Sequence, residues 1–242
     1  MNSTNVPRTF SILSVGNEIL AGDIDNTNAT YLAKRLTVSG HDVIRIVVVP
    51  DSVDDIAEEL RRLREMSDFV IVTGGLGVTH DDVTAEGVAK ALGRRLVLNE
   101  EAVKTMEGRV KSRKAIEKMA TLPEGARVIK NDVGAAPGFI VENVLVMPGV
   151  PAEMKNIFSK VEKEFGCLPY YEEKVRVVGF EDRIADILER LAKKYNVSIG
   201  SYPKKDFVNV KFSGHDREEV EKAKNEFLRE LERRGIPYRE MT

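Results

Sequence analysis

The residues of this sequence that are best suited to chemistry are acids and glycines in one short segment, residues 73–84, which reads TGGLGVTHDDVT. Glycines that follow an apolar run let the backbone approach a ligand with its amides turned outward, and a helix beginning at Thr84 would add its N-terminal dipole. Both features favour a phosphate, which Asp81 and Asp82 would repel. A divalent cation resolves the conflict, because carboxylates hold Mg²⁺ while the metal bridges phosphate oxygens. The same segment could equally be a plain connection whose aspartate caps the helix.

Three other turns carry similar residues. Gly16 and Glu18 follow the first apolar run of the chain, and Asp51, a second candidate ligand or base, follows the next one. Residues 147–151 read MPGVP and lead into a helix with proline at its first position. Such a turn either presents amides to an anion or is only a well-formed cap. Residues 134–138, GAAPG, form a further small-residue segment whose purpose the sequence leaves open.

The composition excludes several classes of protein. Cys167 is the single cysteine, so the chain can form no internal disulfide and no thiolate zinc site, and we expect an inert, partly buried thiol. With three histidines, any metal should be a hard ion with oxygen ligands, such as Mg²⁺ or Mn²⁺. A net charge of -2 argues against nucleic-acid binding through counterion release. No apolar run approaches the roughly 18–20 residues of a membrane span, and we expect a cytoplasmic protein.

Strands that alternate with helices must position these turns. Apolar runs at residues 10–15, 43–49 and 68–73 are followed by amphipathic segments that begin at Asn28 as N-cap, at Ser52 and at Thr84. This alternation predicts a doubly wound α/β domain with a parallel sheet covered on both faces. Ligands bind such a sheet beyond the carboxyl ends of its strands, where the winding reverses. The turns that follow these three runs, at Gly16, Asp51 and Gly74, should therefore meet at one rim.

The rest of the chain divides into an extension and a second domain. Residues 99–120 look helical, and three short apolar runs follow, of which 138–141 and 144–147 should form a hairpin. A helix over 151–165 precedes a break at 166–169, so we expect one domain over residues 1–168 and another over 169–242. The second has the order βαββαβ, which suits a small ferredoxin-like or KH-like α+β domain.

Six segments occur in the order expected of one protein family. They are GNEILAGDIDNTN (16–28), VVPD (48–51), GGLGVTHDDVT (74–84), LPEGA (122–126), GAAPGF (134–139) and MPGVPAEM (147–154). On these segments, residues 8–168 resemble the molybdopterin-binding (MoaB/MogA-like) domain of molybdenum-cofactor biosynthesis proteins. They resemble in particular the amino-terminal part of the competence/damage-inducible CinA proteins and the related domain of FAD synthase. The following domain resembles the small domain that comes next in CinA-type chains, but no amidase domain follows, so we expect no amidase activity.

The chain departs from the family pattern at two places. Val78 stands where the family loop usually has proline, and residues 116–120 read IEKMA where CinA-type chains have an Asn-x-Lys-Gln-Ala stretch. If the second segment contacts substrate, a CinA-like specificity is in doubt.

The resemblance implies a Rossmann-like three-layer fold whose pocket accepts a pterin or a nucleotide with its phosphates. It implies that Asp51 and Asp82 are catalytic and hold a divalent cation, Mg²⁺, Mn²⁺ or Co²⁺. The residues that it places around the substrate and its phosphates are Gly16, Glu18, Asn28, Gly74, Gly75, Gly77, Thr79, Pro148 and Gly149.

Two functions follow from the resemblance as hypotheses. The first is a metal-dependent pyrophosphatase of a nucleotide such as ADP-ribose or FAD. The second is a non-catalytic, or adenylylating, molybdopterin-binding protein. We expect a small-molecule nucleotide or pterin as partner and a homo-oligomer, either dimer or trimer. An RNA-binding role is disfavoured, because residues 172–242 lack the GxxG clamp of KH domains.

Overall fold

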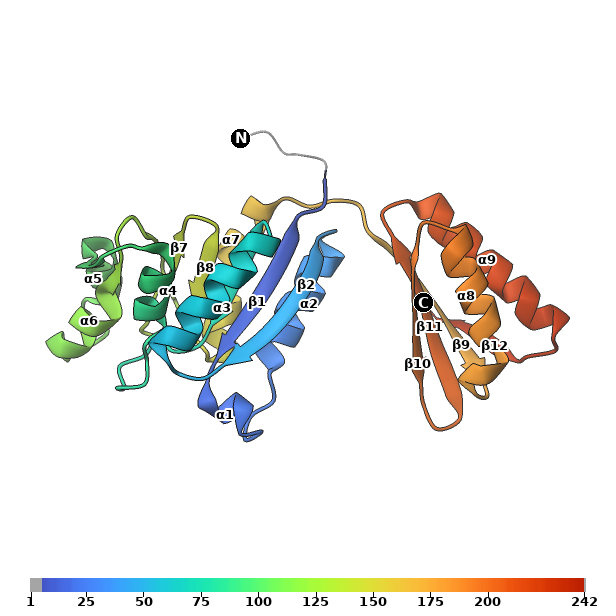
Figure 1. The fold of residues 1–242 in the computed structure, drawn as a ribbon, viewed down its shortest axis with the longest axis horizontal. Coiled ribbons are helices and arrows are strands. Elements are labelled where there is room, and N and C mark those ends of the chain that lie inside the picture. Colours follow the sequence, from blue (N-terminus) through green and yellow to red (C-terminus); the bar gives the residue numbers. More distant parts are fainter. Residues whose placement is uncertain (1–5, 242) are drawn as a thin grey trace. The chain divides into compact units, whose positions relative to one another are not determined.

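The computed structural model describes residues 6–241, and the chain divides between Cys167 and Leu168 into two compact units (Figure 1). This division lies one residue before the predicted one. Cys167 itself is exposed, so the prediction of a partly buried thiol is wrong. Among the described residues, no helix is long and apolar enough to cross a membrane.

A six-stranded mixed sheet forms the centre of the first unit, with the strand order β2-β1-β3-β8-β7-β6. Four strands are parallel: β1 (Thr9–Val15), β2 (Asp42–Val49), β3 (Phe69–Thr73) and β8 (Val144–Met147). The other two, β7 (Gly138–Val141) and β6 (Arg127–Ile129), run antiparallel. The predicted parallel-dominated sheet and its β7–β8 hairpin are confirmed. Glu142 makes the hairpin turn with a φ of 53°.

Helices cover both faces of this sheet, which confirms the three-layer architecture (Figure 1). On one face lie α2 (Thr27–Val38) and α7 (Pro151–Val161), which share a core with Phe10, Ile12 and Ile71 of the sheet. On the other lie α3 (Val53–Met66) and α4 (Thr84–Leu92), which pack on Leu13, Val15, Val70 and Val72. Strand residues alternate between the two cores because successive side chains of a strand point to opposite faces.

Side-chain caps fix where two of these helices begin. Ser52 accepts a hydrogen bond from the Asp55 amide and starts α3 as predicted. The cap of α2 is Asn26, whose Oδ1 accepts from the Ala29 amide at 3.2 Å, so the prediction of Asn28 as N-cap is wrong. Asn28 stands in the first turn of the helix, with its side chain buried.

The segment predicted to be one helical excursion contains two helices, and a short strand lies on each side of it. α5 (Glu100–Met106) and α6 (Arg113–Ala120) are separate because Gly108 takes a φ of 74°, which a helix cannot continue through. β4 (Leu96–Leu98) and β5 (Thr121–Pro123) pair antiparallel beside them. The sequence analysis did not predict the short helix α1 (Asn17–Leu20), which follows β1. The helix predicted over residues 151–165 ends at Val161, and residues Glu162–Phe165 form the 3-10 turn η1 instead.

The second unit has the predicted βαββαβ order. Its elements are β9 (Tyr171–Val178), the 3-10 turn η2 (Glu181–Arg183), α8 (Ala185–Lys194), β10 (Ser198–Pro203), β11 (Phe207–Gly214), α9 (Arg217–Arg233) and β12 (Tyr238–Met241). The four strands pair antiparallel in the order β10-β11-β9-β12, which is the ferredoxin-like arrangement.

Candidate functional site

The carboxyl ends of the four parallel strands lie next to one another at one rim of the first unit. Their order across the sheet places the turn after β1 between those after β2 and β3, with the turn after β8 beyond. Hydrogen bonds extend the pairing into the turns: the Gly16 amide donates to Val49 O (3.1 Å) and the Gly74 amide to Met147 O (3.0 Å). The winding reverses at β1 and β3, which is where open α/β sheets bind ligands.

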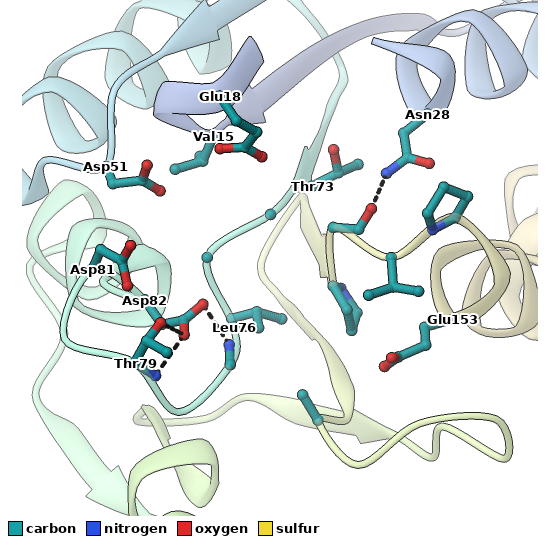
Figure 2. A pocket seen from close by; sticks show the side chains of 18 of the residues that line it. Val15, Glu18, Asn28, Asp51, Thr73, Leu76, Thr79, Asp81, Asp82 and Glu153 are labelled. Atoms are coloured by element: carbon teal, nitrogen blue, oxygen red, sulfur yellow. Dashed lines mark hydrogen bonds between the residues drawn. The ribbon is translucent and has the colours of Figure 1, made fainter. Parts of the chain in front are cut away.

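A pocket of about 780 Å³ opens at this rim (Figure 2). The structure brings almost all of the predicted site residues to its wall: Glu18, Asn28, Asp51, Gly74, Gly75, Gly77, Thr79, Asp82, Pro148 and Gly149. Gly16 is the exception. A Cβ there would lie 2.6 Å from the Glu18 carboxylate, so Gly16 makes room for Glu18 and does not itself line the pocket.

The glycine loop after β3 is shaped by close backbone contacts. Gly74 has a φ of 107°, and a Cβ on it would lie 2.1 Å from the carbonyl oxygen of Val15. Gly75 has a φ of 63°, and a Cβ there would meet Thr84 Oγ1 at 2.2 Å. Only glycine fits both the backbone conformation and the space at these two positions.

Asp82 organises the second half of this loop. Its Oδ1 accepts from the Gly77 amide at 2.7 Å, and its Oδ2 accepts from the Thr79 amide at 2.8 Å and from the Thr79 hydroxyl at 2.6 Å (Figure 2). Lys118 of α6 donates to the Thr79 carbonyl. The donors of Gly77 and Thr79 therefore already have an acceptor within the protein.

Two turns at the rim carry amide donors without a partner. Among residues 6–241, the backbone N–H groups of Gly75, Leu76, Gly149 and Val150 have no hydrogen-bond partner, and all four residues line the pocket. The two turns touch, since a Cβ on Gly149 would lie 3.4 Å from the Cα of Gly74. Val150 also directly precedes α7, whose N-terminal dipole favours an anion.

Asn28 of α2 forms a hydrogen bond with the turn that contains Gly149. Its Nδ2 donates to the Gly149 carbonyl at 2.6 Å (Figure 2), and the residue is 8% exposed. Its Oδ1 is buried and has no partner among the described residues. A buried acceptor without a partner is costly, so this oxygen is suited to receive a donor from a ligand.

The pocket is acidic. Glu18, Asp25, Asp51, Asp81, Asp82 and Glu153 line it, and none of its described lining residues is Lys, Arg or His. Asp51 accepts from the Asn17 amide at 2.8 Å through Oδ2, and among residues 6–241 its Oδ1 has no hydrogen-bond partner. The nearby Thr79 hydroxyl, together with the Asp81 amide, holds the pKa of the Asp81 carboxyl below its ordinary value, so this acid is charged at neutral pH.

No group of three or more His, Cys, Asp or Glu side chains in the described part of the chain is arranged to hold a metal ion. Mg²⁺ is usually bound through one or two carboxylates, with water and substrate phosphates completing the shell. Asp51 and Glu18, which no other described side chain engages, are the carboxylates that fit such a role best.

Glu153 is a pocket residue that the sequence reasoning missed. It stands in the first turn of α7 and lies across the pocket from Asp81 and Asp82 (Figure 2). Its segment, MPGVPAEM, was noted, but an acid in the first turn of a helix is ordinarily explained by the helix dipole. The sequence feature that is related to Glu153 is the glycine-rich segment at residues 134–138, because Gly134 packs directly on the Glu153 carboxylate.

Comparisons with known proteins agree with this geometry. Residues 11–165 match the family model described as "Probable molybdopterin binding domain", and residues 169–240 match "FAD synthase, middle domain". A protein of Archaeoglobus fulgidus is 54% identical over 219 residues, which span 90% of this chain and 96% of the relative. A protein of Pyrobaculum aerophilum is 44% identical over 82% of this chain and 81% of its own.

One solved structure supports the same assignment. The crystal structure of CinA, a protein of unknown function from Thermoplasma acidophilum, superposes with a TM-score of 0.63. It is 40% identical and covers 67% of this chain and 99% of its own. The first unit of the present chain, with its glycine loop and acidic rim, therefore belongs to the family of probable molybdopterin binding domains.

Proposed function

We propose that the first unit binds the phosphates of a nucleotide together with a divalent cation and cleaves the nucleotide's pyrophosphate. The observation that carries this proposal is the charge of the pocket, which has six acidic side chains and, among its described lining residues, no basic one. A pyrophosphate entering such a pocket needs a cation between itself and the carboxylates. The unpaired amides of Gly75, Leu76, Gly149 and Val150 supply the donors that the phosphate oxygens require.

The residues divide the work as follows. Asp51 would hold the cation, with Glu18 on the neighbouring turn as the second carboxylate. Asp82 orders the glycine loop through its three hydrogen bonds. In this proposal Asp82 therefore positions the loop, whereas the sequence analysis predicted that it would be catalytic and hold the cation. When bound, the cation neutralises charge on the phosphoryl oxygens.

The proposed reaction is a hydrolysis, whose only reactants are the nucleotide and water. Water attacks one phosphorus of ADP-ribose, the bridging P–O bond breaks, and the products are the dianions of AMP and ribose 5-phosphate, with release of both protons of the water. FAD would give AMP and FMN in the same way. The loop amides stabilise the charge that develops on the non-bridging oxygens.

The test is chromatographic detection of AMP from ADP-ribose and from FAD with Mg²⁺, Mn²⁺ or Co²⁺, in the wild type and in Asp51→Asn. We expect turnover that EDTA abolishes and that the variant lowers about 100-fold or more. Asp42→Asn is the matched control, because Asp42 is exposed at the amino end of β2, away from the rim. No AMP with any metal, or the same loss in both variants, contradicts the proposal.

A second function is favoured by the family itself, whose model is described as a probable molybdopterin binding domain. The protein would then bind molybdopterin without cleaving a nucleotide. Titration of the wild type with molybdopterin tests this, with micromolar or tighter binding expected. Binding of ADP-ribose without binding of molybdopterin rejects it.

A further inference from the structure

Glu153 lies at the end of the pocket opposite the acidic loop. Figure 2 shows Asp81, Asp82 and Thr79 on one side of the cavity and Glu153 on the other, with Leu76 between them. The residues around its carboxylate differ from those around the acids of the loop.

A buried asparagine holds the Glu153 carboxylate in place. Asn131 is 1% exposed, and its Nδ2 donates to Glu153 Oε2 at 2.5 Å and to the Ala136 carbonyl at 2.9 Å. Asn131 Oδ1 accepts from the amides of Val133 and Gly134 at 3.0 and 2.9 Å. Since both ends of the Asn131 amide are occupied, its orientation is fixed and it presents an N–H donor to Glu153.

The loop around Gly134 packs closely against the same carboxylate. A Cβ on Gly134 would lie 2.0 Å from Cδ and Oε2 of Glu153, so a side chain at position 134 would displace the Glu153 carboxylate from this position. Among residues 6–241, Glu153 Oε1 has no hydrogen-bond partner. One oxygen of Glu153 is therefore anchored and the other remains available as an acceptor.

The adjoining wall suits a flat ring. Leu76, Val110, Ala115, Met119, Ala135 and Ala136 give the pocket a continuous set of apolar side chains. Ligand pockets commonly combine such walls with a few placed polar groups that set orientation and specificity. An ionised carboxylate only accepts hydrogen bonds, so it favours a ring edge that carries N–H donors and disfavours one that carries carbonyl oxygens.

We propose that Glu153 is the specificity-determining residue of the pocket and accepts a hydrogen bond from the exocyclic amino group of the ligand's heterocycle. Adenine and pterin rings have such a group, whereas hypoxanthine, lumazine and flavin rings carry a carbonyl oxygen at the corresponding edges. The inference rests on the proposed function only in that the pocket takes a nucleotide or a pterin.

The test measures binding, so it does not depend on turnover. Calorimetric titrations compare AMP with IMP, in which a carbonyl replaces the amino group, and pterin with lumazine, which differ in the same way at the pteridine ring. We expect the wild type to bind the amino member of at least one pair about tenfold more tightly, because the carbonyl member leaves Glu153 unpaired and faces it with a second acceptor.

The variant Glu153→Gln sharpens this test. Asn131 donates to the side chain at this position, so the glutamine oxygen takes that bond and its NH₂ turns to the ligand. We therefore expect the preference to be lost or reversed in favour of the carbonyl member. Glu65→Gln, at an exposed position of α3, is the matched control and should keep the wild-type preference.

The outcomes separate this inference from the proposed hydrolysis. Equal wild-type affinity within both pairs, or an unchanged preference in Glu153→Gln, overturns the role of Glu153 even if AMP is released from ADP-ribose. An amino preference that Glu153→Gln removes supports it even if no substrate is cleaved. Failure of both pairs to bind contradicts the inference and the nucleotide or pterin pocket together.

Discussion

Gly74 and Val15 approach so closely that a single added carbon on Gly74 would lie 2.1 Å from the Val15 carbonyl oxygen. The contact joins the ends of β1 and β3, at the point where the winding of the sheet reverses. It places the glycine loop directly over the first turn of the site, so the shape of the pocket depends on the absence of a side chain at this position.

Gly74→Ala should therefore destabilise the protein strongly. The variant combines a left-handed backbone, with a φ of 107°, and a clash with a backbone atom that cannot move aside, for a total of about 3 kcal/mol or more. Gly93→Ala is the control, because Gly93 also has a positive φ but no atom lies within 4 Å of its Cβ position. It should cost about 1–2 kcal/mol. Equal losses in denaturant unfolding would show that the contact with Val15 is unimportant.

Removal of the Asp82 carboxylate should loosen the glycine loop. In Asp82→Ala, the Gly77 amide and the Thr79 amide and hydroxyl lose their acceptor, so we expect a stability loss of about 1–2 kcal/mol. Amide hydrogen exchange at Gly77 and Thr79 should accelerate at least tenfold. Asp81→Ala, in the same loop but without these bonds, should leave both exchange rates close to the wild type. Unchanged exchange in Asp82→Ala contradicts the assigned role.

Asn28→Ala should weaken ligand binding more than it weakens the fold of α2. The substitution frees the Gly149 carbonyl and with it the turn that carries two of the unpaired amides, whereas the helix keeps its Asn26 cap. Asn26→Ala should do the reverse and cost about 1 kcal/mol of stability. Titration with AMP and thermal unfolding distinguish the two effects, and identical behaviour of the variants would refute the division of roles.

Asp68 should make stability depend on acid pH. Its Oδ2 accepts from the Thr9 amide and hydroxyl at 2.8 and 2.9 Å, and these bonds hold the pKa of the carboxyl below its ordinary value of 3.8. A lowered folded-state pKa stabilises the protein above pH 3.8, and this stabilisation is lost as the pH falls through the folded value.

Asp68→Asn should accordingly be less stable than the wild type at pH 7, by about 1 kcal/mol or less because the carboxylate is exposed. The difference should shrink once the pH falls below 3.8. Urea unfolding at several pH values measures it, with Asp42→Asn as a control that should show no such trend. A difference that grows in acid contradicts the sign of the effect.

The sequence predicted the frame of this site because strand ends, glycines and acids leave strong local signals. The runs before Gly16, Asp51 and Gly74 could be placed on neighbouring parallel strands, and the family motifs added Pro148 and Gly149. What the sequence could not reveal was which hydrogen bonds the side chains make. Asn26 and Asn28 are both plausible caps, and only the folded chain shows that one caps α2 and the other holds Gly149.

Side-chain contacts and backbone conformations that leave no pattern in the sequence account for the other omissions. Asp82 was expected to face a metal, whereas its oxygens turn to its own loop. Glu153 depends on Asn131, twenty-two residues away, and no local pattern connects them. The excursion at 99–120 read as a helix because its composition is helical, and the left-handed Gly108 that divides it could be recognised only from the backbone.

The central claim is that a cation and a nucleotide pyrophosphate occupy the acidic pocket together, with Asp51 as the cation's ligand. The most direct measurement is the affinity for α,β-methylene-ADP, whose P–C–P bridge water cannot cleave, titrated in Mg²⁺ and in EDTA. The account predicts binding at least about tenfold tighter with Mg²⁺ in the wild type and in Asp42→Asn, and no such gain in Asp51→Asn. Equal affinity with and without the metal, or a full gain in Asp51→Asn, would contradict it.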